Sequence, residues 1–384
     1  MNTKELDIKL NKLPTLTWNY LGLNEVSFNE NIDLNGRGEC IIHNIPAGVV
    51  IGSEGCVACM RGKEAVKSIS GAFPQNIERS VFDDMKTGMG KETGDFFTLN
   101  CNEALSIRAM CGAAADKPLK LNYRLGNEDG YVVRQKITAE AGSVLTVIMD
   151  YSGGREDKGF FGVQTRIYAA EGSVVNVIKL ELLGQNYTHF EDIGGVVSDN
   201  AQINVIQMIM GGGRNYAGLN IELSGYKSSF NGNVGYLCLN DQKLDMNYYI
   251  GHSGRRSNSA LKVVGALRDR ASKNFRGTID LKHGAKGACG DEQEETLLLS
   301  KDVKNKTLPI ILCDEDDVEG THGASIGRLS ADTLFYMQSR GIGEKEAELL
   351  MTKAKLNTVR NLIKDESSIG MLQHYMEEAF DNGR

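Results

Sequence analysis

The sequence is poor in the residues that stiffen or cross-link a small exported protein. Its 384 residues include five prolines, one tryptophan and eight cysteines. Eight cysteines spread over a chain of this length do not form a disulfide framework, so we expect reduced thiols. The first residues, Met1 to Asp7, carry acids where a signal peptide needs an apolar segment, and no apolar run approaches membrane-spanning length. These absences predict a cytoplasmic protein.

Basic residues are also in deficit, because 43 Lys and Arg stand against 50 Asp and Glu. The net charge of −7, with no basic run, gives no general attraction to nucleic acid. A hydrophobic share of 41% and a charged share of 24% are typical of a soluble globular protein. We therefore expect neither nucleic acid nor a membrane as a partner.

Two motifs of familiar enzymes are missing. The segment Gly88–Glu92 resembles a phosphate-binding loop only superficially, because Met85 and Glu92 stand where that loop requires a glycine and a Ser or Thr. The His-Glu-x-x-His motif of zinc proteases does not occur either. We therefore expect no nucleotide on this chain and no catalytic residue.

An internal repeat dominates what is present. Segment 141–148 returns as 171–178 and, more faintly, as 200–206, with 30 residues from Gly142 to Gly172 and 29 from Gly172 to Ala201. Each copy has a small turn residue and then the polar and β-branched alternation of a half-buried strand. The chain between the copies again predicts strand, without an amphipathic helix. The repeat therefore indicates a stacked, mainly β solenoid.

Changes of pattern divide the chain into three expected regions. Residues 1–35 are expected to form an N-terminal arm, with a short helix over residues 3–13 and with Trp18 docking the arm on the body. Residues 36–328 are expected to form the β-helix core, regular from about residue 118. Residues 329–384 are expected to form a helical domain.

The helical domain has clear start and stop residues. Ser330 is a good N-cap and Gly341 a good helix terminator. A second helix is expected from Glu344, with one apolar face made of Ala347, Leu350, Met351 and Ala354. Such helices either cap the open end of a solenoid or bind a partner, and the sequence leaves both open.

Two groups of residues suggest metal chemistry. Cys56 and Cys59 form a Cys-x-x-Cys pair without a second pair at zinc-ligand spacing, which favours ordinary half-buried cysteines. Thiol, imidazole and carboxylate groups also gather near the end of the β region. This mixture suits iron or zinc, but composition alone favours a solvated acidic rim with one satisfied histidine. These residues are His283, Cys289, Asp291, Glu292, Glu294, Glu295, Cys313, Asp314, Glu315, Asp316, Asp317, Glu319 and His322.

A long motif follows this group. An acidic DDV at residues 316–318 is followed by THGA at 321–324, LFY at 334–336 and RGI at 340–342. Upstream, segment 272–277 contains the S…N…RG pattern. Together these runs resemble the SufB/SufD family of iron–sulfur cluster assembly proteins, over roughly residues 260 to 345.

The resemblance implies a right-handed parallel β-helix with helical ends, acting as a non-catalytic scaffold. It implies docking of an ABC-type ATPase, SufC, on the C-terminal helices, so that ATP is hydrolysed on the partner subunit. Two β-helix subunits, either two copies of this chain or this chain and a SufB-like sibling, would pair through their C-terminal strands. An iron–sulfur cluster would form transiently at that interface, with sulfur supplied indirectly by a cysteine desulfurase system.

The resemblance also selects site residues. His322 falls on the family's histidine and becomes a candidate ligand of iron or of the cluster. Glu294 stands where the SufB branch has a cysteine, and Gly323 where it has a glutamate, so the chain is more similar to SufD. A carboxylate at Glu294 still suits iron, and in a self-paired assembly Cys289 and Cys313 are further candidates.

Two other classes of function stay open on sequence alone. A carbohydrate-active β-helix enzyme would carry a long groove of acidic and aromatic side chains along one face of the solenoid. A purely structural adaptor would have an acidic rim that binds no metal.

Overall fold

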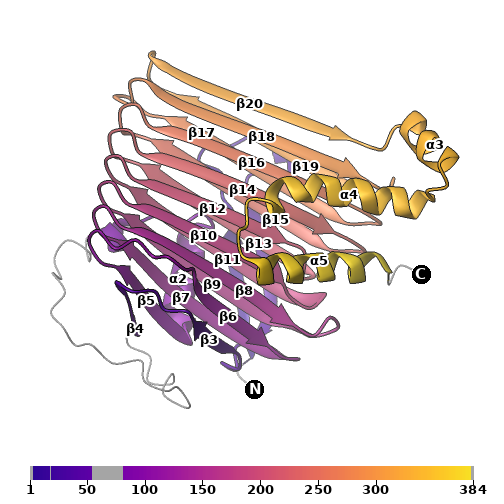
Figure 1. Ribbon diagram of the computed structural model, residues 1–384, viewed down its shortest axis with the longest axis horizontal. Helices are drawn as coiled ribbons and strands as arrows, with labels where there is room; N and C mark the ends of the chain where they lie inside the picture. The colour runs from indigo at the N-terminus through magenta and orange to yellow at the C-terminus, as the bar shows by residue number, and fades with distance from the viewer. Residues whose placement is uncertain (1–2, 18, 54–80, 382–384) are drawn as a thin grey trace.

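The computed structural model describes residues 3–17, 19–53 and 81–381. The predictions for Trp18, Cys56 and Cys59 concern residues outside the described ranges. The described chain forms a parallel β-solenoid, with an N-terminal arm on one side and three α-helices at the C-terminal end (Figure 1). The predicted solenoid with C-terminal helices is therefore confirmed.

Two nine-stranded sheets form the solenoid, and each coil gives one strand to each sheet. The even sheet contains β3 (Glu39–His43), β6 (Leu119–Leu125), β8 (Val144–Gly153), β10 (Val174–Leu182), β12 (Gln202–Ile209), β14 (Ser229–Cys238), β16 (Asn258–Leu267), β18 (Ala288–Leu298) and β20 (Val318–Gly327). The odd sheet contains β4 (Val49–Ser53), β5 (Glu103–Ala109), β7 (Asp129–Ala139), β9 (Lys158–Ala169), β11 (Asn186–Val197), β13 (Arg214–Leu223), β15 (Lys243–His252), β17 (Ser272–Leu281) and β19 (Lys304–Cys313). Neighbouring strands are parallel except at the N-terminal end, where β3 and β4 pair antiparallel with β6 and β5.

The repeat seen in the sequence sets the register of the even sheet. Val144 pairs with Val174, which pairs with Gln202. Inward-facing positions consequently stack like on like, and Val147, Val177 and Val205 are at most 1% exposed. Each fully buried side chain of this size contributes on the order of 1.5–3 kcal/mol, so a continuous β-branched column stabilises the solenoid along its whole axis.

A residue in the left-handed backbone region precedes each repeated strand. Gly142 and Gly172 have φ of 66° and 65°, and their N–H groups donate to carbonyl oxygens of the following coil at 2.9 Å. In the third copy Asn200 (φ 55°) takes this place, one residue before Ala201. The alignment on Ala201 was wrong by one residue, because asparagine also tolerates this conformation and replaces the glycine that marks the other turns.

The N-terminal arm is a hairpin rather than a helix. It contains β1 (Thr3–Leu10), the single-turn helix η1 (Asn19–Leu21) and β2 (Val26–Asp33), and it lies beside α2 (Lys91–Asn100). The helix expected over residues 3–13 was wrong. Leu6 and Leu10 lie four residues apart, a spacing that places both on one face in a helix and also in a strand. The strand forms because both side chains then pack beside Phe28 on the outer face of the odd sheet.

Arg276 fastens this arm to the solenoid. Its buried guanidinium donates to the carbonyl oxygen of Leu23 and forms an ion pair with Asp245 Oδ1 at 2.7 Å. Asn11 Nδ2 donates to the same carboxylate oxygen, also at 2.7 Å. The arginine of the S…N…RG run therefore has a structural role, because it joins two neighbouring coils to the arm.

Three helices complete the chain: α3 (Ala331–Ser339), α4 (Glu344–Arg360) and α5 (Glu366–Asp381). Ser330 Oγ accepts a hydrogen bond from Thr333 N at 3.0 Å, as the predicted N-cap, and Gly341 (φ 87°) follows the last turn of α3. Helices α4 and α5 pack against the outer face of the even sheet, where Leu356 and Leu372 are fully buried (Figure 1). The even sheet therefore lies between the solenoid core and a helical layer.

Replacing Arg276 by methionine is expected to lower the free energy of unfolding by about 3 kcal/mol, because Asp245 then stays buried without its guanidinium partner. Urea titration followed by circular dichroism measures the change. Arg270→Met is the matched control, since Arg270 and Asp241 form an ion pair on the exposed surface, where solvent screens the attraction and its loss should change stability little. Equal destabilisation by both substitutions would contradict the role of Arg276 in joining the arm to the solenoid.

Candidate functional site

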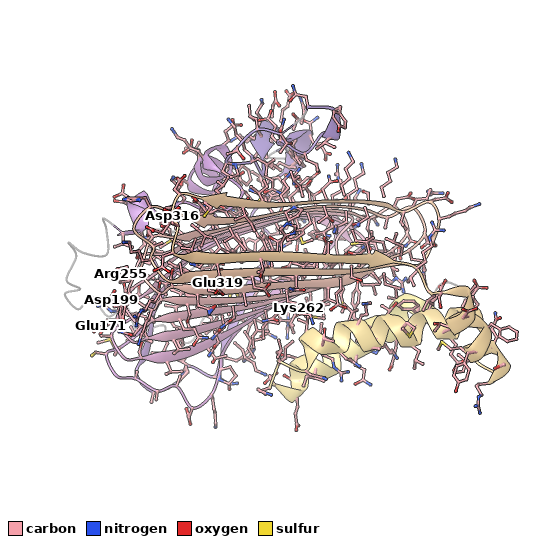
Figure 2. All side chains as sticks on the ribbon, turned by 90° about the horizontal axis from the view of Figure 1, so that it is seen from above. Glu171, Asp199, Arg255, Lys262, Asp316 and Glu319 are labelled. Carbon is pink, nitrogen blue, oxygen red and sulfur yellow. The ribbon has the colours of Figure 1, made fainter. Side chains whose placement is uncertain are left out.

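The C-terminal end of the solenoid is open. Among the described strands, β20 pairs only with β18 and β19 only with β17, so each presents one edge with free backbone N–H and C=O groups. Most residues of β20 are exposed. Figure 2 looks onto this end and shows β20 lying across it, with Glu319 labelled on the strand. An exposed edge of this length is a template for pairing with another chain.

His322 lies in the middle of this edge strand and is exposed. It pairs in register with Glu292 of β18, and paired residues of parallel strands point to the same face of a sheet. Glu292 is only 3% exposed and points into the solenoid, toward β17. His322 therefore lies where the interior of the solenoid meets the open end, and its side chain is accessible from outside.

Glu292 is the carboxylate nearest to His322 in the register, and sequence reasoning did not select it as a ligand. Burial, with Glu294 and Asp291 nearby, raises its pKa to about 8. Gly277 of the S…N…RG run makes room for it, because a Cβ there would come within 2.0 Å of Glu292 Oε2. The glycine is thus required by the close approach of an acidic side chain from the opposite sheet.

Glu294 lies inside the solenoid, two residues further along β18. It is 2% exposed and forms an ion pair with Lys273, and Thr296 Oγ1 donates to its Oε1 at 2.9 Å. Burial lowers the pKa of Lys273, which the negative charge of Glu294 opposes. Within one chain the Glu294 carboxylate is thus held by a lysine rather than presented at the edge.

The two candidate cysteines do not join His322. Cys289 faces the outer side of β18, with Sγ 4.0 Å from Glu319 Oε2, and burial together with this carboxylate raises the pKa of its thiol. Cys313 is exposed at the end of β19, where its Sγ donates to the carbonyl oxygen of Glu315 at 3.2 Å. In the described part of the chain, the one group of three metal-ligating side chains with mutually close ligand atoms lies elsewhere.

A Gly-x-Ser-x-Gly run occupies residues 323–327, within β20. In hydrolases this spacing places the serine on a sharp turn between a strand and a helix. Here the whole run is extended, so Ser325 lacks the turn that would present it as a nucleophile.

The helical tail carries an exposed apolar surface. On α3, Phe335 is 72% and Tyr336 59% exposed. On α4 the expected apolar face is buried only in part: Ala347 is buried, but Leu350 is 51% exposed, and the buried face runs on through Leu356. Packing against the even sheet has selected a face rotated from the one that the spacing predicted. Aromatic side chains exposed to this degree are typical of a protein interface.

Comparison with known proteins points to one family. A family model described as "SUF system FeS cluster assembly, SufBD core domain" matches residues 123–355. The iron–sulfur cluster assembly protein SufD of Bacillus subtilis (strain 168) is 38% identical over 110 residues, which are 29% of this chain and 25% of that protein. The iron–sulfur cluster assembly protein SufD of Escherichia coli (strain K12) is 23% identical over 265 residues, which are 68% of this chain and 63% of that protein.

The matched segments thus span 25% and 63% of the length of these two relatives. The family model covers more than half of this chain, including β18, β20, His322 and the helix α3. None of the helices in the described part of the chain is long and apolar enough to span a membrane.

In the metal-free chain, Glu292→Gln is expected to change the pH dependence of stability. The raised pKa of Glu292 means that the folded chain binds a proton more tightly than the unfolded chain, so the stability of the wild type falls as the pH rises from about 4.5 to about 8. The variant has no such proton to lose and should gain about 2–4 kcal/mol relative to the wild type over this window.

Urea titrations at pH 5 and pH 8 measure this difference. Glu319→Gln, which removes an exposed carboxylate from β20, is the control and should leave the difference between the two pH values unchanged. If Glu292→Gln and the wild type lose stability in parallel between pH 5 and pH 8, the assignment of the slope to Glu292 fails.

Proposed function

The chain belongs to the SufBD family of SUF-system iron–sulfur cluster assembly proteins, and from this premise we propose that it is a SufD-like scaffold subunit of the assembly complex. The observation that carries the proposal is the exposed histidine in the middle of an open edge strand. In this function the iron–sulfur cluster is cargo, and the chain contributes ligands and a surface rather than a catalytic group.

Pairing through the open end is the first part of the proposal. The edges of β19 and β20 carry unsatisfied backbone groups, and a second β-helix subunit would satisfy them. Ile326, 45% exposed on the same strand, would lose its contact with water. The partner is either a second copy of this chain or a SufB-like sibling, and in both cases His322 faces the other subunit.

Cluster formation at this interface is the second part. Among the candidates in the described part of the chain, none is presented at the open end beside His322: Glu292 is buried, Lys273 holds Glu294, and the cysteines Cys289 and Cys313 lie apart. A complete site therefore draws its remaining ligands from the partner subunit. Neutral imidazole suits iron, and binding at an interface leaves the cargo releasable when the subunits separate.

The third part of the proposal is that the C-terminal helices dock an ATPase. We assign α3, with Phe335 and Tyr336, to a SufC-like ABC-type ATPase, which would hydrolyse ATP on behalf of a chain that has no phosphate-binding loop. Sulfur would arrive indirectly from a cysteine desulfurase system. We place this assembly in the cytoplasm, which keeps thiols reduced.

The carbohydrate-active alternative requires a long open face along the solenoid. The outer face of the even sheet is instead packed against α4 and α5, and that of the odd sheet against the N-terminal hairpin and α2 (Figure 2). Family membership and this packing both favour the scaffold.

His322→Ala is expected to reduce iron–sulfur loading at least tenfold while leaving subunit pairing intact, because it removes a ligand without touching the backbone edge. The chain is co-expressed with its β-helix and ATPase partners and reconstituted anaerobically with iron and sulfide, and loading is measured by iron content and visible absorption. His283→Ala, at a second exposed histidine in the turn before β18, is the matched control. Unchanged loading and unchanged maturation of iron–sulfur enzymes in cells carrying His322→Ala would refute the ligand role.

A double replacement, Phe335→Ser with Tyr336→Ser, is expected to weaken binding of the ATPase at least tenfold, because two exposed aromatic anchors are lost from α3. Co-purification and titration calorimetry measure it. Leu16→Ser, at an equally exposed apolar residue on the N-terminal arm, serves as the control. ATPase binding that survives the double replacement undiminished would place the docking surface elsewhere.

A further inference from the structure

A second set of metal-ligating side chains lies inside the solenoid, far along the chain from His322. Glu181 is the second-to-last residue of strand β10, and His189 and Glu191 follow on β11 of the same coil. All three are at most 1% exposed. One ligand atom from each lies within 4.8 Å of the other two. The coil thus closes two carboxylates and an imidazole around one point between the two sheets.

Only one of the two ring nitrogens of His189 has a hydrogen-bond partner. Its Nδ1 lies 2.9 Å from the carbonyl oxygen of Phe161, which only accepts, so Nδ1 carries a proton. Its Nε2 has no hydrogen-bond partner although it is buried, and Glu181 Oε2 has none either. These two unpartnered atoms point to the same place, where an electron-poor occupant would satisfy both.

The distances fit a metal ion better than a proton. Nε2 lies 3.6 Å from Glu181 Oε2 and 3.7 Å from Glu191 Oε2. A protonated imidazole would draw one carboxylate oxygen to a hydrogen-bond distance of about 2.7–3.2 Å. Ligand atoms that share a zinc or iron ion at about 2.1 Å stand roughly 3.4–3.6 Å apart in tetrahedral or trigonal geometry.

Each of the three side chains is also held by a second hydrogen bond, as metal ligands commonly are. Gln207 Nε2 donates to Glu181 Oε1 at 3.1 Å, and Gln207 is itself fixed by the hydroxyl of Tyr248 at 2.7 Å. Tyr151 Oη donates to Glu191 Oε2 at 2.9 Å, and Lys179 Nζ to Glu191 Oε1 at 2.5 Å. Burial raises the pKa of Glu181, which is the cost that a bound cation would offset.

We propose that Glu181, His189 and Glu191 bind one divalent first-row transition-metal ion, of the class of Fe²⁺ or Zn²⁺, inside the solenoid. Imidazole and carboxylate together suit this class of ion. Because the three side chains are closed off from solvent, the ion enters as the coil folds and exchanges slowly afterwards. The site stabilises the middle of the solenoid and does not depend on the proposed function at the open end.

The full-length chain, produced with iron and zinc in the medium, is purified in the presence of EDTA and analysed by mass spectrometry of its metals. We expect about one ion per chain, resistant to EDTA in the native protein and released on unfolding in urea. Glu181→Gln should lower the metal content at least tenfold. Glu103→Gln, at another buried carboxylate that accepts from a tyrosine hydroxyl, and His322→Ala should both keep the ion.

Crystallographic anomalous scattering from the wild type tests the same site without any substitution. A peak about 2.1 Å from His189 Nε2 supports the proposal. A metal-free interior with Nε2 at hydrogen-bond distance from Glu181 or Glu191 overturns it, since the occupant is then a proton on the imidazole. An ion that is lost with His322→Ala but retained with Glu181→Gln overturns it as well, and assigns the metal to the open end.

Discussion

The parallel hydrogen-bond ladder between successive coils is the constraint on which the rest of the structure depends. Because Val144, Val174 and Gln202 are register partners, the strand residues of one coil lie over their partners in the next, while the turns absorb the differences in coil length. The ladder thereby turns a sequence repeat into columns of apolar, turn and polar side chains. The ladder also leaves the last strand with one unpaired edge, because among the described strands β20 pairs only with β18. The exposed edge and the placement of His322 on it follow from the same rule.

The interior of the solenoid is not uniformly apolar, and two of its buried lysines are each paired with a buried carboxylate. Lys179 pairs with Glu191 in the middle of the solenoid, and Lys273 pairs with Glu294 near its open end, with all four side chains withdrawn from water. A buried charge is tolerated when it is paired and hydrogen-bonded, whereas removing one partner leaves an uncompensated ion. These pairs constrain how the coils stack, since each lysine reaches a carboxylate on the opposite sheet.

The sequence predicted those features that are determined by neighbouring residues, and missed those that depend on contacts between distant parts of the chain. The solenoid and the helix start at Ser330 were predictable because repeated alternation and an N-cap act within a few residues. The N-terminal strand was not, because Leu6 and Leu10 suit both periods until the odd sheet selects one. The sequence selected Glu294, whereas the residue that pairs with His322 is Glu292, and finding it required the register, which exists only once the coils are stacked. Glu181 and His189 flank a turn, and their meeting with Glu191 depends on the closure of a coil. The one feature of the sequence that pointed to this interior site was the presence of ionisable residues inside otherwise apolar strands.

Amide hydrogen exchange distinguishes an open end that pairs with another subunit from one that stays free. The purified chain is compared with the same chain in its assembled complex. If the edge strands pair across an interface, the amides of residues 304–313 and 318–327 become protected on assembly, while those of the central strands, which are hydrogen-bonded on both sides, should exchange slowly in both states. Edge amides that exchange equally fast in the free and assembled states would mean that β19 and β20 do not pair with another subunit.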